Sequence, residues 1–194
     1  TFLLWFGWFG FNGFSQLAMG TFNDVTAISK IAVNTHLAGA AGTVTGAVLS
    51  RLLGGKTDVI MMLNGALAGL VAITAEPLAP TPGFAIVIGS IGSVIMYFGT
   101  KMLENFGLDD VVGAIPVHMF AGVFGTLVVP LTNKSTAFST QFIGTLSVCV
   151  FSFVLSYIIF KSMKATIGLR ISKEAEKLGT DKAEVGVVAY AIRD

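Results

Sequence analysis

The chain has 194 residues, of which 54% are hydrophobic and only 12% are charged, and its mean hydropathy is +0.81. A soluble domain needs more polar surface than this composition supplies. The formal net charge is +1, and the basic residues flank apolar segments without stacking aromatics among them, so no nucleic-acid partner is expected.

Apolar runs close to membrane-spanning length recur along the chain, and a helix needs about 20 residues to cross a hydrocarbon layer. No pattern of alternating strands is present, so helices are the remaining way to satisfy the backbone in lipid. The sequence predicts an all-α polytopic membrane protein with about six transmembrane helices. The expected spans are residues 1–17, 25–53, 59–75, 83–103, 111–131 and 137–160.

The first span carries one distinctive helical face. Leu4, Trp8, Phe11 and Ser15 recur at a spacing that stacks them in one stripe. Aromatic faces attract cations by about 0.5–2 kcal/mol, and a hydroxyl accepts a hydrogen bond from an N–H donor. The stripe therefore suits capture of a small hydrogen-bonding cation, although an interfacial aromatic belt with core packing has the same spacing. Because no signal-peptide pattern precedes it, we expect the chain to begin inside a span, as part of a longer protein.

Small and polar residues in the next spans predict close helix packing. His36 follows Asn34 and Thr35 in a run rich in alanine and glycine, which is typical of a helix–helix contact. Small residues at a spacing of four let backbones approach closely in lipid. The spaced pairs are Gly42 with Gly46, Gly65 with Gly69, and Gly89 with Ser93.

The loops are short and contain turn residues. The first is expected from Asn12-Gly13 to Asp24. Asp24 and Asp58 each precede an apolar run and are expected to be helix N-caps. The sequon at Asn133 is interpreted as a chance match.

The fifth span contains the most informative residues. Asp109 and Asp110 open it, and His118 lies eight residues after Asp110, about 12 Å along a helix. A lone titratable ring in a bilayer-length apolar segment marks a candidate functional site, because burying it is costly. Neutral imidazole has one donor and one acceptor edge and can relay hydrogen bonds through a dry channel, although an interhelical contact would also explain it. Pro116 is expected to leave a bare backbone acceptor one turn earlier, and Asp110 to cap or anchor the inner helix end.

Basic residues concentrate on one set of loops. Arg51 and Lys56 lie between the second and third spans, and Lys101 ends the fourth, whereas the opposite loops carry only Lys30 and Lys134. By the positive-inside rule the first set faces the cytoplasm, and six spans then place both chain ends inside.

The composition of the chain becomes more charged near its end. Residues 1–164 are expected to form the transmembrane domain and residues 165–194 a cytoplasmic tail, too short for an enzyme domain. The lone Cys149 is interpreted as a small core residue. Seven basic residues follow the last span: Lys161, Lys164, Arg170, Lys173, Lys177, Lys182 and Arg193.

Catalytic and metal-binding patterns are weak in this sequence. The two histidines lie in different spans and make no short-spaced metal site, and paired intramembrane carboxylates are absent. We expect a protein that is not an enzyme and that needs no metal or cofactor.

Several motifs together resemble the second half of an ammonium transporter of the Amt/Mep/Rh superfamily. They occur in the family's order and cover nearly the whole chain. They read LWFGWFGFNG at 4–13 with Ser15, AVNTHLA at 32–38, LNGALAGLVAITA at 63–75, DDVVGAIPVH at 109–118 with Gly122, and GLR at 168–170.

The resemblance implies a fold of eleven spans, made of two inverted five-helix repeats and a long final helix, assembled as a homotrimer with one pore per subunit. This chain resembles the second repeat plus the last helix. Inverted repeats meeting at the midplane are a recurring transporter design. We expect a multi-pass protein in lipid, in a cell membrane that is a prokaryotic inner membrane, with the C-terminus cytoplasmic.

The resemblance also implies roles for individual positions. Ser15 matches the hydroxyl of the outer ammonium-recruitment site, Phe11 one of two stacked gate rings, and Trp8 a pore-lining ring beneath it. His118 matches one of twin pore histidines, and Asp110 the acid at the inner end of that helix. Leu4 completes the stripe below Trp8. The substrate would be ammonium, carried as ammonia, with methylammonium as a further substrate; the partner ring and histidine belong to the other half.

Departures from the family leave alternatives open. Phe14 replaces a usual glycine beside Ser15, and residues 179–187 lack the family's tail pattern, which weakens the case for a PII-type regulator as a partner. The sequence around His118 also resembles that of transporter-like modules fused to signalling domains. An ammonium sensor is therefore the alternative function, and a structural multi-span subunit without substrate is a third.

Overall fold

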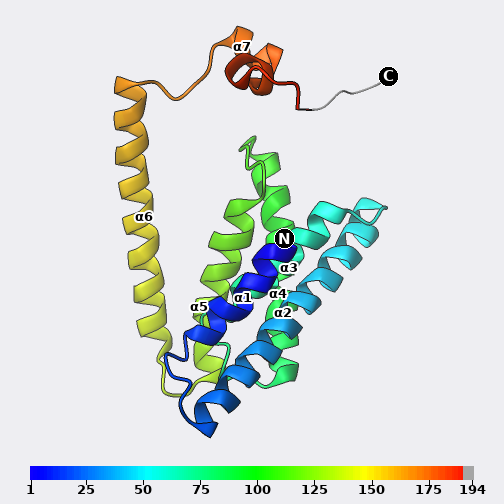
Figure 1. The fold of residues 1–194 in the computed structure, drawn as a ribbon, viewed down its shortest axis with the longest axis vertical. Helices are drawn as coiled ribbons and strands as arrows, with labels where there is room; N and C mark the ends of the chain where they lie inside the picture. Colours follow the sequence, from blue (N-terminus) through cyan, green and yellow to red (C-terminus); the bar gives the residue numbers. More distant parts are fainter. Residues whose placement is uncertain (190–194) are drawn as a thin grey trace. The chain divides into compact units, whose positions relative to one another are not determined.

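The computed structural model describes residues 1–189, and these form helices with no strand among them (Figure 1). The predicted all-α fold is confirmed. Arg193 and the last part of the predicted tail lie outside the described residues. The helices are α1 (Phe2–Phe14), α2 (Phe22–Gly54), α3 (Val59–Thr74), α4 (Pro82–Asn105), the π-helix η1 (Ile115–Phe120), α5 (Ala121–Thr132), α6 (Phe138–Thr166), α7 (Lys173–Leu178) and the π-helix η2 (Asp181–Val185).

All six predicted apolar segments are helical, but they differ in length. Among residues 1–189, four helical segments are long and apolar enough to cross a membrane: α2, α4, the continuous segment Ile115–Thr132 and α6. The apolar helix α3 has 16 residues and α1 has 13, which correspond to about 24 Å and 20 Å of rise. Both are shorter than a hydrocarbon core of about 30 Å.

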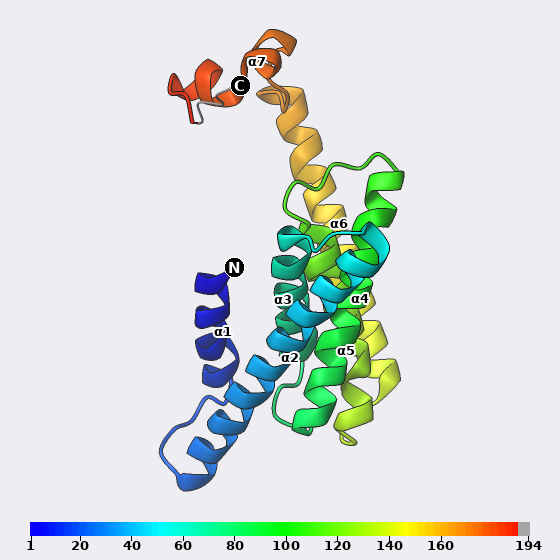
Figure 2. The same ribbon diagram turned by 90° about the vertical axis from the view of Figure 1, so that its right-hand side faces the viewer.

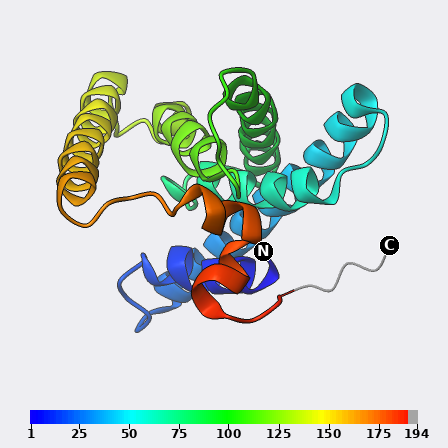
Figure 3. The same cartoon turned by 90° about the horizontal axis from the view of Figure 1, so that it is seen from above.

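The chain divides into two compact units, Thr1–Leu146 and Ser147–Asp194, and the division falls inside α6. The first unit is the helical bundle that carries all the candidate site residues. Helix α3 packs against each of α1, α2, α4, η1 and α5 and so forms the centre of this bundle (Figure 3). The second unit contains the rest of α6 with α7 and η2. The proposed division into a membrane domain and a tail after residue 164 stays a prediction.

Glycines allow α2 to lie directly on α3 and α4 (Figure 2), as the spacing predicted. A methyl group on Gly42 would meet the carbonyl oxygen of Gly65, and one on Gly69 or Gly89 would meet that of Ala38. The backbones are therefore in contact at these points, so the glycines are packing residues.

The helix caps agree only in part with expectation. Asp58 is the N-cap of α3, and its Oδ1 accepts hydrogen bonds from the Ile60 and Met61 amides at 2.7 and 3.2 Å. The prediction for Asp24 was wrong in position: Thr21 is the N-cap of α2, and Asp24 closes the capping box from the third helical position. A threonine three residues before an acid satisfies two backbone donors at once.

The first loop also begins later than predicted. Helix α1 continues through Asn12 and Gly13 to Phe14, so the connection to α2 covers only residues 15–21. Asn12 is buried and donates a hydrogen bond from Nδ2 to Thr35 Oγ1 at 3.0 Å. This bond between α1 and α2 satisfies the amide inside the bundle, which local turn preference does not anticipate.

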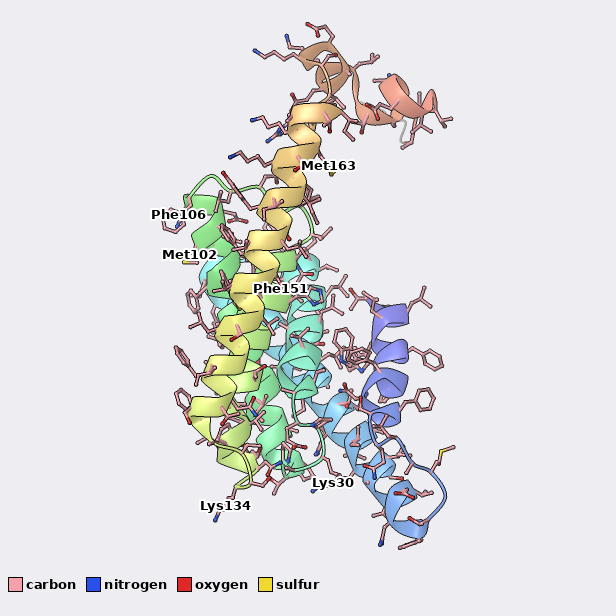
Figure 4. The ribbon with its side chains drawn as sticks, turned by 90° about the vertical axis from the view of Figure 1, so that its left-hand side faces the viewer. Lys30, Met102, Phe106, Lys134, Phe151 and Met163 are labelled. Carbon is pink, nitrogen blue, oxygen red and sulfur yellow. The ribbon has the colours of Figure 1, made fainter. Side chains whose placement is uncertain are left out.

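Successive loops of the first unit alternate between its two ends. Figure 4 shows Lys30 and Lys134 at one end and Phe106, after α4, at the other. The two lysines that sequence analysis assigned to the outer side thus share one end of the bundle.

Candidate functional site

The stripe of Leu4, Trp8, Phe11 and Ser15 runs along α1, and we call it the α1 stripe. Its residue Trp8 is fixed by packing and by a hydrogen bond. Its indole Nε1 donates to Thr74 Oγ1, at the end of α3, at 2.7 Å. The half-buried ring also packs against the main core cluster of the bundle. An indole N–H inside a protein usually finds such a partner, and here the bond sets the orientation of the ring.

Phe11 and Ser15 continue the stripe toward the loop. The Phe11 ring meets Trp8 edge to face, with centroids 6.1 Å apart and an interplanar angle of 62°. The Ser15 hydroxyl donates to the Phe11 carbonyl at 2.9 Å, so its lone pairs remain free to accept from an N–H donor. Both side chains are exposed within the described part of the chain.

These two residues line an open hollow of about 510 Å³. Its other lining residues are Gly7, Gly10, Phe14 and Leu17. An aromatic face and a free hydroxyl acceptor at one hollow match the chemistry of a small cation that donates hydrogen bonds. Leu4 lies one turn below Trp8 and does not line the hollow.

His118 lies on η1, a six-residue π-helix where a plain α-helix was expected. Its neighbours Pro116 and Val117 are buried against the bundle, whereas His118 is exposed. Within residues 1–189 no hydrogen bond joins the imidazole to another group. Short π-helical turns inside α-helices are rare and are frequent at functional sites.

The start of η1 is held by polar groups from its own loop and from α3. The Asp110 carboxylate accepts hydrogen bonds from the Ala114 and Ile115 amides at 2.8 and 2.7 Å. The expectation of a bare acceptor before Pro116 was wrong: Asn64 Nδ2 donates to the Val112 carbonyl at 3.1 Å. Neither Asn64 nor Thr74 was recognised from sequence as a site residue, because each acts through a partner distant along the chain.

Close packing continues past the imidazole. A methyl group on Gly125 would meet the carbonyl oxygen of Ala72, so α5 lies directly on α3. On the other side, a methyl on Gly99 of α4 would come within 2.6 Å of the Phe120 ring. The helix that carries His118 is thus held between α3 and α4, with the imidazole on the remaining face.

The second histidine belongs to a different contact. The His36 ring lies 5.5 Å from the Trp5 ring and 6.2 Å from the Phe9 ring, between centroids, and is nearly parallel to Phe9. It therefore joins α2 to α1. Helix α2 does not contact η1 in the described chain, and no group of metal-ligating side chains is present in residues 1–189, so the two histidines form no common site.

The α1 stripe and His118 are also separate surfaces. Helices α1 and η1 do not touch, and each packs on α3. Val117 and Ala121 belong to one buried core cluster, and Trp8 packs against the same cluster. In the described chain, the aromatic hollow and the imidazole therefore lie on different helices that both pack against α3.

Comparison with known proteins identifies a family that matches nearly the whole chain. The model of the Ammonium Transporter Family matches residues 1–190. The chain is 41% identical to ammonium transporter Amt2 of Archaeoglobus fulgidus, over 98% of this chain and 44% of that protein. It is 37% identical to a putative ammonium transporter of Synechocystis sp., over 95% of this chain and 43% of that protein. These relatives are named as transporters, in keeping with the expectation that the chain is not an enzyme.

Solved structures of Amt and Mep proteins are also similar to this chain. A structure named as a sensor Amt protein matches with a TM-score of 0.85 and 32% identity, over 94% of this chain and 47% of that chain. Candida albicans Mep2 matches with a TM-score of 0.80 and 25% identity, over 94% of this chain and 44% of that chain. The chain thus spans less than half the length of the proteins that it resembles.

Proposed function

Because this chain belongs to the Ammonium Transporter Family and forms a multi-pass helical membrane protein, we propose that it is the second half of a protein that selectively conducts ammonium. The family match over residues 1–190 carries this proposal. The aromatic hollow at Phe11 and Ser15, and the exposed imidazole of His118, support it with suitable chemistry.

The proposed route begins at the hollow. Ammonium is recruited by the Phe11 ring and the Ser15 hydroxyl, with Trp8 and Leu4 continuing the path below. Removing water from a permanent charge in a low-dielectric corridor costs far more than one aromatic ring returns. The substrate therefore loses its proton and passes as ammonia along His118, while the proton is relayed separately.

The first experiment asks whether the full-length protein conducts at all. Reconstituted in proteoliposomes, it is expected to give a current on addition of ammonium and none on addition of potassium. Absence of any ammonium-evoked flux, electrical or isotopic, would contradict transport.

One observation favours a second candidate, an ammonium sensor, because a structure named as a sensor Amt protein is similar to this chain. A sensor binds ammonium at the hollow without net flux and signals through another domain. Sequencing beyond Asp194 separates the two: a kinase or cyclase domain there supports sensing, and a stop codon removes that support. The third reading, a structural subunit, predicts that ammonium does not protect an engineered Ser15→Cys from labelling.

The recruitment site has its own test. Phe11→Ala is expected to raise the half-saturating ammonium concentration about three- to tenfold, because it removes one cation–π contact. Phe6→Ala is the matched control, since Phe6 is an exposed ring of the same helix on another face. Equal shifts in both variants of the full-length protein would contradict a specific role for Phe11.

The proposed setting follows the family. The protein assembles as a homotrimer in a prokaryotic inner membrane, with its C-terminal tail in the cytoplasm. Ammonium is the substrate, and methylammonium is a further one. A PII-type regulator is a weaker proposal, because the tail sequence around Asp181 and Gly186 departs from the family pattern.

A further inference from the structure

A missing backbone donor lies at the start of the helix that carries His118. The Val117 amide donates to the Gly113 carbonyl at 3.1 Å, which is the four-residue register of an α-helix. In the same register, residue 116 would donate to the Val112 carbonyl. Residue 116 is a proline and has no N–H, so the Val112 carbonyl lacks its helical partner.

Asn64 supplies the absent donor from another helix. Its Nδ2 lies 3.1 Å from the Val112 oxygen, across 48 residues of chain. Its amide also lies directly over Gly113, where an added methyl would come within 2.7 Å of Nδ2. Gly113 has a φ of +75°, a backbone conformation that glycine adopts without strain.

The same short segment is also held by Asp110, whose carboxylate accepts from the Ala114 and Ile115 amides. Two donors and one acceptor that the helix start leaves unpaired are thus satisfied by two side chains. A helix end left without such partners would reorganise to find them.

The register of η1 decides where His118 points. In an α-helix each residue turns the side-chain direction by about 100°, so a slip of one residue moves an imidazole to a different face. The π-helix begins at Ile115, two residues after Gly113, and His118 is its fourth residue. The contact of Asn64 with Val112 and Gly113 therefore sets the face of the helix on which the imidazole lies.

We propose that Asn64 is a positioning residue for His118: its side-chain amide replaces the N–H that Pro116 lacks and fixes the start of the π-helix. This proposal rests on the proposed function, in which His118 lines the ammonium route. Asn64 does not line the outer hollow, so its effect is on turnover and not on capture of the cation.

The test uses the full-length protein in proteoliposomes and the variant Asn64→Leu, which keeps the side-chain size and removes the donor. The ammonium-evoked current at saturation is expected to fall about three- to tenfold, the effect of one neutral hydrogen bond, with an unchanged half-saturating concentration. Ser50→Ala is the matched control, because Ser50 Oγ, on α2, accepts from the amide of Asp58 at 3.1 Å, away from η1. This control is expected to keep the wild-type current.

Double variants show whether the effect passes through η1 and His118. In a His118→Ala background, Asn64→Leu is expected to cause no further loss, because the group that it positions is gone. In a Pro116→Ala background the loss is expected to shrink, since alanine restores an N–H for the Val112 carbonyl. The proposal would be overturned if Asn64→Leu reduced the current in both backgrounds by the same factor as in the wild-type background. It would also be overturned if Asn64→Leu alone kept the wild-type current.

Hydrogen exchange separates this inference from the proposed function. The amides of Ile115 and of residues 117–121 are expected to exchange faster in Asn64→Leu than in wild type or Ser50→Ala. If wild type shows no ammonium flux, electrical or isotopic, but this acceleration is seen, the proposed function fails while the clamp stands. No acceleration overturns the clamp. If the leucine variant does not reach the membrane, Asn64→Ala replaces it under the same criteria.

Discussion

At the scale of single residues, the hydrogen bond between Asn12 and Thr35 is a buried polar contact that joins α1 to α2. Their exposed fractions are 1% and 0%. Thr35→Val keeps the shape of the side chain but leaves the Asn12 amide without its acceptor. A buried donor without a partner costs about 1–3 kcal/mol, so we expect the unfolding free energy of the full-length protein in detergent to fall by that amount.

Thr43→Val is the control for this prediction. The Thr43 hydroxyl donates only to the Gly39 carbonyl of its own helix, at 2.9 Å, so little change is expected. Equal destabilisation by both valine variants would show that the contact with Asn12 contributes nothing specific.

The sequence predicted those site residues that form a pattern within one short segment. The α1 stripe follows from helical spacing, and the structure places Trp8, Phe11 and Ser15 along one side of α1. Asn64 could not be recognised in this way, because its partner Val112 lies 48 residues away and only the fold brings them together.

At the scale of helices, the contact between α2 and α3 depends on glycine. Gly42→Ala would place a methyl group against the carbonyl oxygen of Gly65, so the two backbones must separate. Overpacking of this kind costs about 1–3 kcal/mol, and we expect a lower thermal unfolding midpoint in detergent. Gly83→Ala is the matched control, since a methyl there meets no atom within 4 Å. A midpoint lowered equally by both would contradict the packing role.

The helices themselves were predictable because long apolar runs and cap residues are local features. The exceptions have physical causes. Turn preference at Asn12-Gly13 is overridden by the buried bond to Thr35, and the N-cap of α2 moves to Thr21 because a capping box satisfies two donors. The π-helix at Ile115–Phe120 has no hydrophobic period of its own, so only the structure reveals it.

At the scale of the whole molecule, the alternation of loops predicts which ends face which side of the membrane. Lys134 is expected outside and Lys56 inside, because most basic residues flank the cytoplasmic loops. Each is replaced by cysteine in a full-length protein with Cys149→Ala and no other cysteine. A membrane-impermeant maleimide added to right-side-out vesicles is expected to label Lys134→Cys and to spare Lys56→Cys. The reverse pattern would invert the orientation.

The central claim is that His118 lines the route by which this protein conducts ammonium. Its most direct test is the ammonium-evoked current of the full-length protein in proteoliposomes, compared between His118→Ala and His36→Ala. We expect a strongly reduced or less selective current in the first variant. The second should keep its current, because His36 packs against Trp5 and Phe9 in a separate contact. If His118→Ala conducts ammonium with undiminished rate and selectivity, the proposed role of this imidazole is wrong.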